Sequence, residues 1–244
     1  YNCEHSIFKS IGYTLRNVYA RWTKAYLRNV DMFACITEFQ KKKLIEAGYD
    51  KNKITVIPNS IDAPCSYTPT SGEYIAYIGR LSYEKGYDLL VEVARKHPEI
   101  KFRFAGAQRE QKNTDIPSNV EFAGYLQKDK LLEFIQKARF IVIPSRCYEG
   151  FPMAILEAAC HGKPAIASNH GGFTEIIGQG ENAIGKLFEP SNTDDLDKQI
   201  AELWNNQTLT EELGEKAFRK LKKHYDSEVV YKQWETLFSK LKNS

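Results

Sequence analysis

Short apolar runs alternate with helical patterns from residue 31 to residue 189, and no other feature restricts the fold as strongly. The expected strands are the runs DMFACIT, KITVIPN, YIAYIGR, KFRFAG, VEFAGY, FIVIPS, PAIAS and AIGKLFE. Helical patterns lie between them, near residues 38–48, 85–97, 127–137, 152–162 and 173–178. Because nearly continuous apolar strands separated by helices are typical of a parallel sheet covered on both faces, we predict an α/β fold.

Two stretches depart from this alternation. Residues 59–73, NSIDAPCSYTPTSGE, hold prolines, a glycine and several serines and threonines between two strand patterns, which is the composition of an interdomain linker. After residue 189 the strand patterns stop, and helical patterns fill residues 191–204, 208–225 and 227–242. We therefore expect a C-terminal helical cap.

Composition argues against several classes of protein. The formal net charge of the 244 residues is +3, without the dense basic face that is usual in nucleic-acid-binding domains. No apolar run approaches the ~18 residues that a membrane span needs. The five cysteines are scattered without C-x-x-C spacing, which favours free thiols in a reducing, cytoplasmic compartment. The first residues, YNCEHS, are neither an initiator Met nor a signal peptide, so we expect the chain to be a fragment of a longer protein.

Ligands of an open parallel sheet bind outside the carboxyl ends of its strands, so the loops there form the candidate site. The first such loop, IGRLSYEKG at residues 78–86, carries Arg80 and Lys85 near the start of a helix. Two cations and free helix N–H groups at one point would stabilise an anion such as a phosphate. Alternatively, Lys85 pairs with Glu84 or faces solvent, and Arg80 pairs with a nearby carboxylate.

The second loop, IPSRCYEGFP at residues 143–152, leads into a helix of small residues. Pro152 is expected in the first turn of this helix, where its missing N–H costs nothing. The backbone N–H groups of Phe151 and Met153 would then point toward the strand ends.

Two glutamates, Glu149 and Glu157, lie on either side of this helix entry. Alanines around Glu157 allow the helix to pack closely on the sheet, so its carboxylate needs partners, which a hydroxyl-rich ligand would supply. Alternatively, Glu157 forms a salt bridge with an Arg or Lys at the edge of the core, and Glu149 caps its own helix.

The third loop, ASNHGGFTE at residues 167–175, has Gly171 and Gly172 before a short helix expected to begin near Thr174 and Glu175. The two glycines allow close approach to the backbone, although a plain tight turn is the commoner reason for such a pair. Neither G-x-G-x-x-G nor G-x-x-x-x-G-K-[ST] occurs, so the ordinary dinucleotide and NTPase fingerprints are missing. The five histidines are dispersed, and we expect no protein-bound metal and no cofactor.

From about residue 31 to its C-terminus the sequence resembles the retaining family 4 glycosyltransferases of the GT-B fold. The resemblance rests on VIPNSID, YIGRLSYEKGYDLLVEVA, VEFAGYL, the E-x7-E element EGFPMAILE, GKPAIASNHGGFTEII and GKLFEPSNTDDLDKQI. Members have two Rossmann-like domains that face each other across a cleft. The resemblance therefore implies a metal-independent glycosyltransferase that moves a sugar from a UDP- or GDP-linked donor to a glycan or lipid-linked acceptor, with retention of anomeric configuration.

The resemblance also implies roles for the residues of the loops. Arg80 and Lys85 would bind the donor diphosphate. Glu149 and the backbone of residues 151–153 would contact the sugar, and Glu157 would accept hydrogen bonds from the ribose hydroxyls. The two glutamates would thus serve opposite ends of one nucleotide-sugar.

Other family features are less clear in this sequence. Base contacts are expected from loops near Gly106 and Tyr125, whose composition does not separate UDP from GDP. The Gly-rich loop and the acceptor-facing histidine of complete members cannot be located in residues 1–63, and His5 lies too close to the terminus for that role.

By the same resemblance the chain divides into four parts. They are the tail of the N-terminal acceptor domain at 1–63, a linker at 64–72, the donor-binding domain at 73–225, and at 226–244 a helix that returns to the N-terminal domain. Such a fragment alone is expected to be inactive in transfer. Two alternatives remain: a non-catalytic nucleotide-sugar binding module, or another GT-B enzyme such as a sugar-nucleotide epimerase.

Residues 12–29, GYTLRNVYARWTKAYLRN, have aromatic and aliphatic side chains at helical spacing together with several cations. A basic amphipathic helix of this kind can lie in an anionic lipid surface, which would place the protein peripherally on the inner face of the membrane. The favoured alternative is that the apolar stripe packs on a further part of the N-terminal domain.

Overall fold

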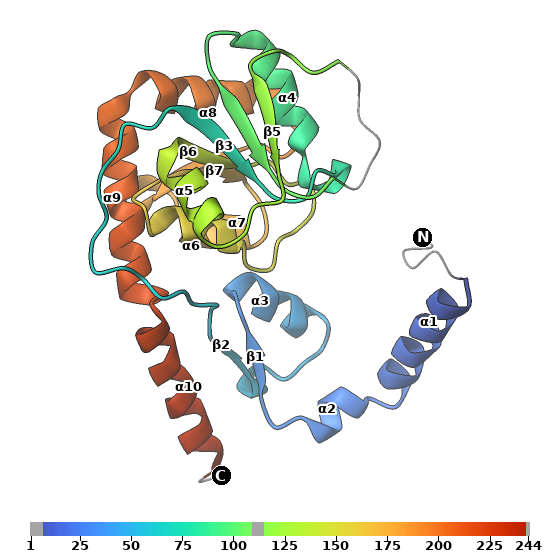
Figure 1. The fold of residues 1–244 in the computed structure, drawn as a ribbon. Coiled ribbons are helices and arrows are strands. Elements are labelled where there is room, and N and C mark those ends of the chain that lie inside the picture. The colour runs from blue at the N-terminus through green and yellow to red at the C-terminus, as the bar shows by residue number, and fades with distance from the viewer. Residues whose placement is uncertain (1–6, 109–114, 243–244) are drawn as a thin grey trace.

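The computed structural model describes residues 7–108 and 115–242. Its larger unit is built on a six-stranded sheet with strand order β5-β4-β3-β6-β7-β8 (Figure 1). Every neighbouring pair of strands is parallel. The strands are β3 (Tyr74–Ile78), β4 (Phe102–Ala105), β5 (Val120–Gly124), β6 (Ala138–Ile143), β7 (Ala165–Ser168) and β8 (Gly185–Phe188). Each overlaps a predicted run, although β6 begins two residues before its run, and the α/β prediction is confirmed.

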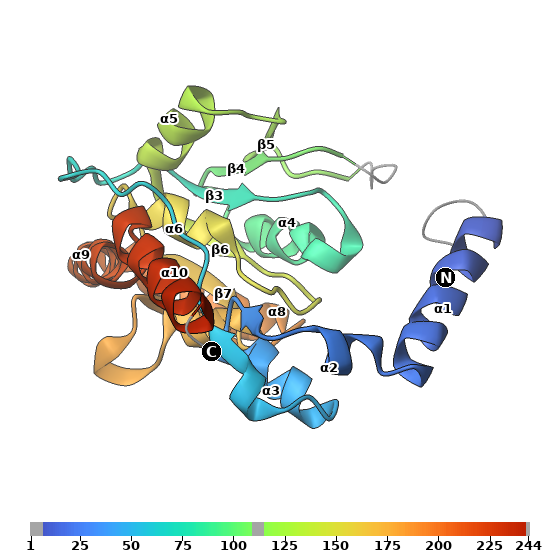
Figure 2. The ribbon, with the colours of Figure 1, turned by 90° about the horizontal axis from the view of Figure 1, so that it is seen from below.

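Helices cover both faces of the sheet (Figures 1 and 2). One face packs on α5 (Asp129–Lys137), α6 (Met153–Ala159) and α7 (Gly172–Ile177), and the other on α4 (Tyr87–Lys96) and α8 (Thr193–Asn205). Side chains of a strand alternate between the faces, so Tyr74 and Ala76 of β3 enter the first core while Ile75 and Tyr77 enter the second. The predicted two-sided burial is therefore present.

Two long helices at the end of the chain confirm the predicted helical cap. Helix α9 (Gln207–His224) contributes Ala217 and Leu221 to the first core and Leu213 to the second. Helix α10 (Ser227–Lys242) continues away from the sheet (Figure 1). It begins beside the segment that follows β2, because the Ser227 N–H donates to the carbonyl of Ile61 at 3.1 Å.

The strand order places the candidate loops at a reversal of chain direction. From β3 the chain moves outward through β4 and β5, and then returns to β6 on the other side of β3. In open parallel sheets the ligand crevice lies where the order reverses, outside the carboxyl ends of the two central strands. The loops after β3 and β6 are those that carry Arg80, Lys85 and Glu149.

A smaller unit precedes the sheet. It contains the parallel pair β1 (Phe33–Cys35) and β2 (Ile54–Val56), the helix α3 (Glu38–Glu46) and the turn η1 (Lys51–Lys53). The segment between β2 and β3 then runs alongside α9 (Figure 1). It is attached to the larger unit, since buried Lys163 donates to the carbonyl of Thr70 at 2.9 Å and the ring of Tyr67 lies 4.9 Å from that of Phe218. The division into domains remains a prediction.

The prediction of a single amphipathic helix at residues 12–29 is wrong in detail. The structure has two helices, α1 (Ile7–Trp22) and α2 (Ala25–Asn29), because Lys24 takes a left-handed conformation with φ 52°. Helix α1 lies apart from the sheet (Figure 1), and Phe8 and Trp22 are 88% and 82% exposed. Contact of this face with a membrane or with another part of the protein stays a prediction.

Candidate functional site

The loop after β3 brings two cations to the crevice. Arg80 follows the strand by two residues, and Lys85 ends the short turn η2 (Tyr83–Lys85) that leads into α4. Arg80 is partly exposed, with one guanidinium nitrogen 3.5 Å from a carboxylate oxygen of Glu84. The carboxylate partner expected for Arg80 is therefore present, but it is a loose surface ion pair that contributes little stability.

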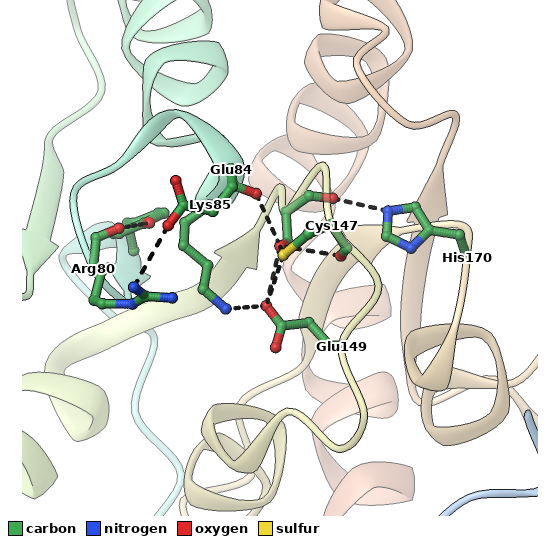
Figure 3. A network of polar contacts seen from close by, with 8 residues as sticks. Arg80, Glu84, Lys85, Cys147, Glu149 and His170 are labelled. Carbon is green, nitrogen blue, oxygen red and sulfur yellow. Dashed lines mark hydrogen bonds and ion pairs between the residues drawn. The ribbon is translucent and has the colours of Figure 1, made fainter. Parts of the chain in front are cut away.

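Lys85 reaches across the crevice to the loop after β6. Its ammonium group forms an ion pair with Glu149 Oε1, and both side chains are only 20% exposed (Figure 3). The expectation that Lys85 pairs with Glu84 or solvent is wrong, and so is the expectation that Glu149 caps its own helix. The two residues, 64 positions apart, form a salt bridge between the two central strands of the sheet.

Ser145 and His170 support this ion pair, and neither role was predicted from the sequence. The fully buried hydroxyl of Ser145 donates to Glu149 Oε1 at 3.0 Å. The Nε2–H of His170 donates to the carbonyl of Ser145 at 2.9 Å (Figure 3). The signals available were a Ser directly after a buried strand and a His before two glycines, and neither specifies its partner.

The third loop is fastened to the second through backbone contacts. The Gly172 N–H donates to the carbonyl of Glu149 at 3.1 Å. A Cβ at position 172 would lie 2.7 Å from the carbonyl oxygen of Gly150, so only glycine fits this close approach. Helix α7 starts at Gly172, before the expected Thr174 and Glu175, and Gly171 is its N-cap. These glycines accommodate the neighbouring loop.

Glu157 lies in α6, which packs closely on the sheet. Ala158 and Ala159 are fully buried, as expected for a helix packed closely on the sheet. The half-buried Glu157 carboxylate makes no hydrogen bond or ion pair with any residue that the structure describes, so the alternative of a salt bridge to Arg or Lys is wrong. Burial raises the pKa of Glu157 above its ordinary value. A carboxylate held in this way gains from any ligand that donates hydrogen bonds to it.

The residues at the entry to α6 differ slightly from the prediction. Pro152 is the N-cap, one position before the helix, and Met153 is the first helical residue. The ring of Phe151 packs edge-on against Tyr225 at 5.6 Å between centroids. Their backbone contacts with a sugar remain predictions.

The loops expected to contact the base lie at the ends of β4 and β5. A Cβ at Gly106 would be 1.7 Å from the carbonyl oxygen of Gly79, so the backbones of the loops after β3 and β4 touch and the glycine is explained by packing. Tyr125 follows β5 and is 69% exposed. Contact of either residue with a base is untested.

The smaller unit meets the site through a contact that the sequence did not indicate. The Glu175 carboxylate of α7 accepts a hydrogen bond from the backbone N–H of Glu38 at 2.8 Å and a longer one from Phe39 at 3.3 Å. It thus binds the N-terminus of α3, where the helix dipole favours a negative charge. Burial raises the pKa of Glu175. The rings of Phe39 and Tyr148 add a contact at 5.2 Å.

Two further features of the described residues bear on the class of site. No group of three or more His, Cys, Asp or Glu side chains in residues 7–108 and 115–242 is placed to hold a metal ion. Within the same ranges no helix is both long and apolar enough to cross a bilayer.

Comparison with known proteins identifies the class to which this fold and site belong. Residues 66–220 match the family described as glycosyl transferases group 1, and residues 3–63 match glycosyltransferase family 4. The chain therefore belongs to the group 1 glycosyltransferases. Its fold is that of GT-B glycosyltransferases, as predicted.

Particular relatives and structures agree with this assignment. An uncharacterized glycosyltransferase of Methanocaldococcus jannaschii is 33% identical over 193 residues, which are 77% of this chain and 53% of the relative. Sucrose-phosphate synthase of Thermosynechococcus elongatus superimposes with a TM-score of 0.78 at 21% identity, over 90% of this chain and 60% of that one. The Anabaena protein HepE in complex with UDP gives 0.78 at 18% identity, over 88% and 65%. The chain spans about half the length of the first curated relative.

Proposed function

We propose that this chain carries the nucleotide-sugar site of a retaining glycosyltransferase that transfers a sugar to a glycan or lipid-linked acceptor. The observation that carries the proposal is the Lys85–Glu149 ion pair across the two central strands, with Arg80 beside it. A diphosphate could replace Glu149 as the partner of Lys85, and Glu149 would then be free to accept hydrogen bonds from the sugar. The ion pair would thus hold both side chains in position before the donor binds.

The proposed chemistry follows from the charge that develops on the donor. When the bond between the sugar and the diphosphate breaks, negative charge grows on the bridging oxygen of the leaving group. Arg80 and Lys85 would stabilise that charge because they are already placed at the crevice. Retention of configuration would result if the acceptor attacks on the face that the leaving group vacates.

The raised pKa of Glu157 and the lack of a partner for it among the described residues support its proposed place at the ribose. Two neighbouring hydroxyls would donate to its two oxygens. UDP is the first nucleotide to test, since the structural neighbour HepE was solved with UDP.

A panel of nucleotide-sugars tests the proposal by thermal shift. The matching donor should stabilise the chain by roughly 2.7 kcal/mol at a hundred times its dissociation constant. The corresponding nucleoside and free sugar should stabilise it far less at the same concentration. Glu157→Gln should lose part of the preference for ribose over 2′,3′-dideoxyribose nucleotides. If no nucleotide-sugar stabilises the chain more than its separate parts, the proposed function is wrong. If a nucleotide-sugar does stabilise the chain, product analysis on the full-length enzyme distinguishes transfer from binding alone.

A further inference from the structure

A basic pocket lies beside the C-terminal end of α7, whereas the loop of Glu149 contacts the N-terminal end of that helix. It has a volume of about 380 Å³ and is formed by the turn η3 (Gly180–Asn182) and the last turns of α9. Its lining includes four cations, a histidine and one carboxylate, namely Lys216, Arg219, Lys220, Lys223, His224 and Glu181. None of these residues belongs to the loops of Arg80, Lys85 or Glu149.

Two of the lysines are held in place by backbone carbonyls. Lys220 is half-buried, and its ammonium group donates to the carbonyl of Ile176 at 2.7 Å and to that of Glu175 at 3.3 Å. Lys216 donates to the carbonyl of Glu181 at 3.2 Å. Because an ammonium group has three N–H donors and a carbonyl carries no net charge, these contacts position both cations without neutralising them. Burial lowers the pKa of Lys220, and the charge of Glu175 opposes that shift.

The remaining basic side chains of the pocket differ in how much positive charge they add. Lys223 has no hydrogen-bond or ion-pair partner in the part of the chain that the structure describes. Arg219 pairs with Glu215 one turn away on α9. Partial burial lowers the pKa of His224, and the charges of Lys223 and Lys220 lower it further. The pocket therefore has more cations than its carboxylates can balance.

We propose that this pocket binds a phosphate group, carried by a soluble phosphorylated ligand or by a phospholipid headgroup. Oxyanions with two negative charges suit several converging ammonium groups, and charge-assisted hydrogen bonds are the strong ones. The volume leaves room for the group that bears the phosphate. The pocket is separate from the donor site, and its ligand does not depend on the proposed transfer reaction.

Calorimetric titration with inorganic pyrophosphate tests the soluble form of this proposal on the complete chain. Lys216→Gln combined with Lys223→Gln should lower the affinity of the pocket roughly tenfold, because it removes two charge-assisted contacts. Lys223→Gln alone should cause part of this loss without affecting folding, since Lys223 has no partner among the described residues. The matched control replaces Lys198 and Lys232, exposed lysines of α8 and α10, by Gln and should bind as the parent does.

A second arm measures co-sedimentation with phosphatidylcholine vesicles, with and without phosphatidic acid. A loss in the Lys216 and Lys223 variant that is limited to the phosphatidic acid vesicles assigns the site to lipid, and a loss limited to pyrophosphate assigns it to a soluble phosphate. Lys85→Ala, which alters the proposed donor site, should leave the binding of both probes to the basic pocket unchanged. The proposal is overturned if parent, variant and control bind both probes equally, or if the parent binds neither.

Discussion

Lys85→Ala should lower the affinity of the chain for UDP by roughly ten- to a hundredfold and leave the affinity for uridine close to that of the parent. The substitution removes a charge-assisted contact to the diphosphate, worth on the order of 1.5–3 kcal/mol. It also leaves Glu149 without its cationic partner, so that an unpaired carboxylate would face the incoming diphosphate. Both effects act on the diphosphate and neither acts on the nucleoside.

Isothermal titration calorimetry with UDP and uridine measures this difference. Lys130→Ala is the matched control, because Lys130 is exposed on α5 and should affect neither ligand. Combining Lys85→Ala with Glu149→Gln should recover part of the lost affinity by removing the unpaired charge. Equal losses for UDP and uridine in Lys85→Ala would mean that the lysine does not bind the diphosphate.

Gly106→Ala should destabilise the fold by about 3 kcal/mol, the upper end of the cost of overpacking. Its methyl group would sit 1.7 Å from the carbonyl oxygen of Gly79, and this atom is backbone and cannot rotate away. The ends of β3 and β4 would have to separate, which also moves Arg80. For a chain of this length the melting temperature should fall by roughly 6–12 °C.

Thermal unfolding followed by circular dichroism checks this loss. Gly12→Ala is the control, because a Cβ at Gly12 in α1 meets nothing within 4 Å. Alanine is also the better helix former, so this variant should be at least as stable as the parent. A Gly106→Ala chain with the same melting temperature as the parent would contradict the close approach of the two loops.

The fold could be predicted from the sequence because its elements are locally encoded. The apolar runs of β3 and β6 are buried on both faces, and the helix patterns between the strands have one apolar side. The division of residues 7–29 into two helices was missed, since the left-handed turn at Lys24 occurs at a residue type that does not favour it. The start of α7 at Gly172 was missed because it depends on contact with the preceding loop.

The site could be predicted only as a set of candidates. The sequence places Arg80, Lys85 and Glu149 after strands, but their pairing depends on β3 and β6 being neighbours, which is a property of the strand order. The Ser145 and His170 contacts join loops 25 residues apart and require the folded geometry. A resemblance to known motifs supplied the roles, whereas the ion pair between Lys85 and Glu149 came from the structure alone.

We expect a donor diphosphate to bind between Arg80 and Lys85, at the carboxyl ends of the central strands. A crystal structure of the chain with UDP measures this directly. Diphosphate oxygens should lie within hydrogen-bond distance of Lys85 Nζ and the Arg80 guanidinium, the Lys85–Glu149 ion pair should be open, and the ribose hydroxyls should lie on Glu157. A diphosphate found elsewhere, with the Lys85–Glu149 ion pair intact, would contradict this expectation.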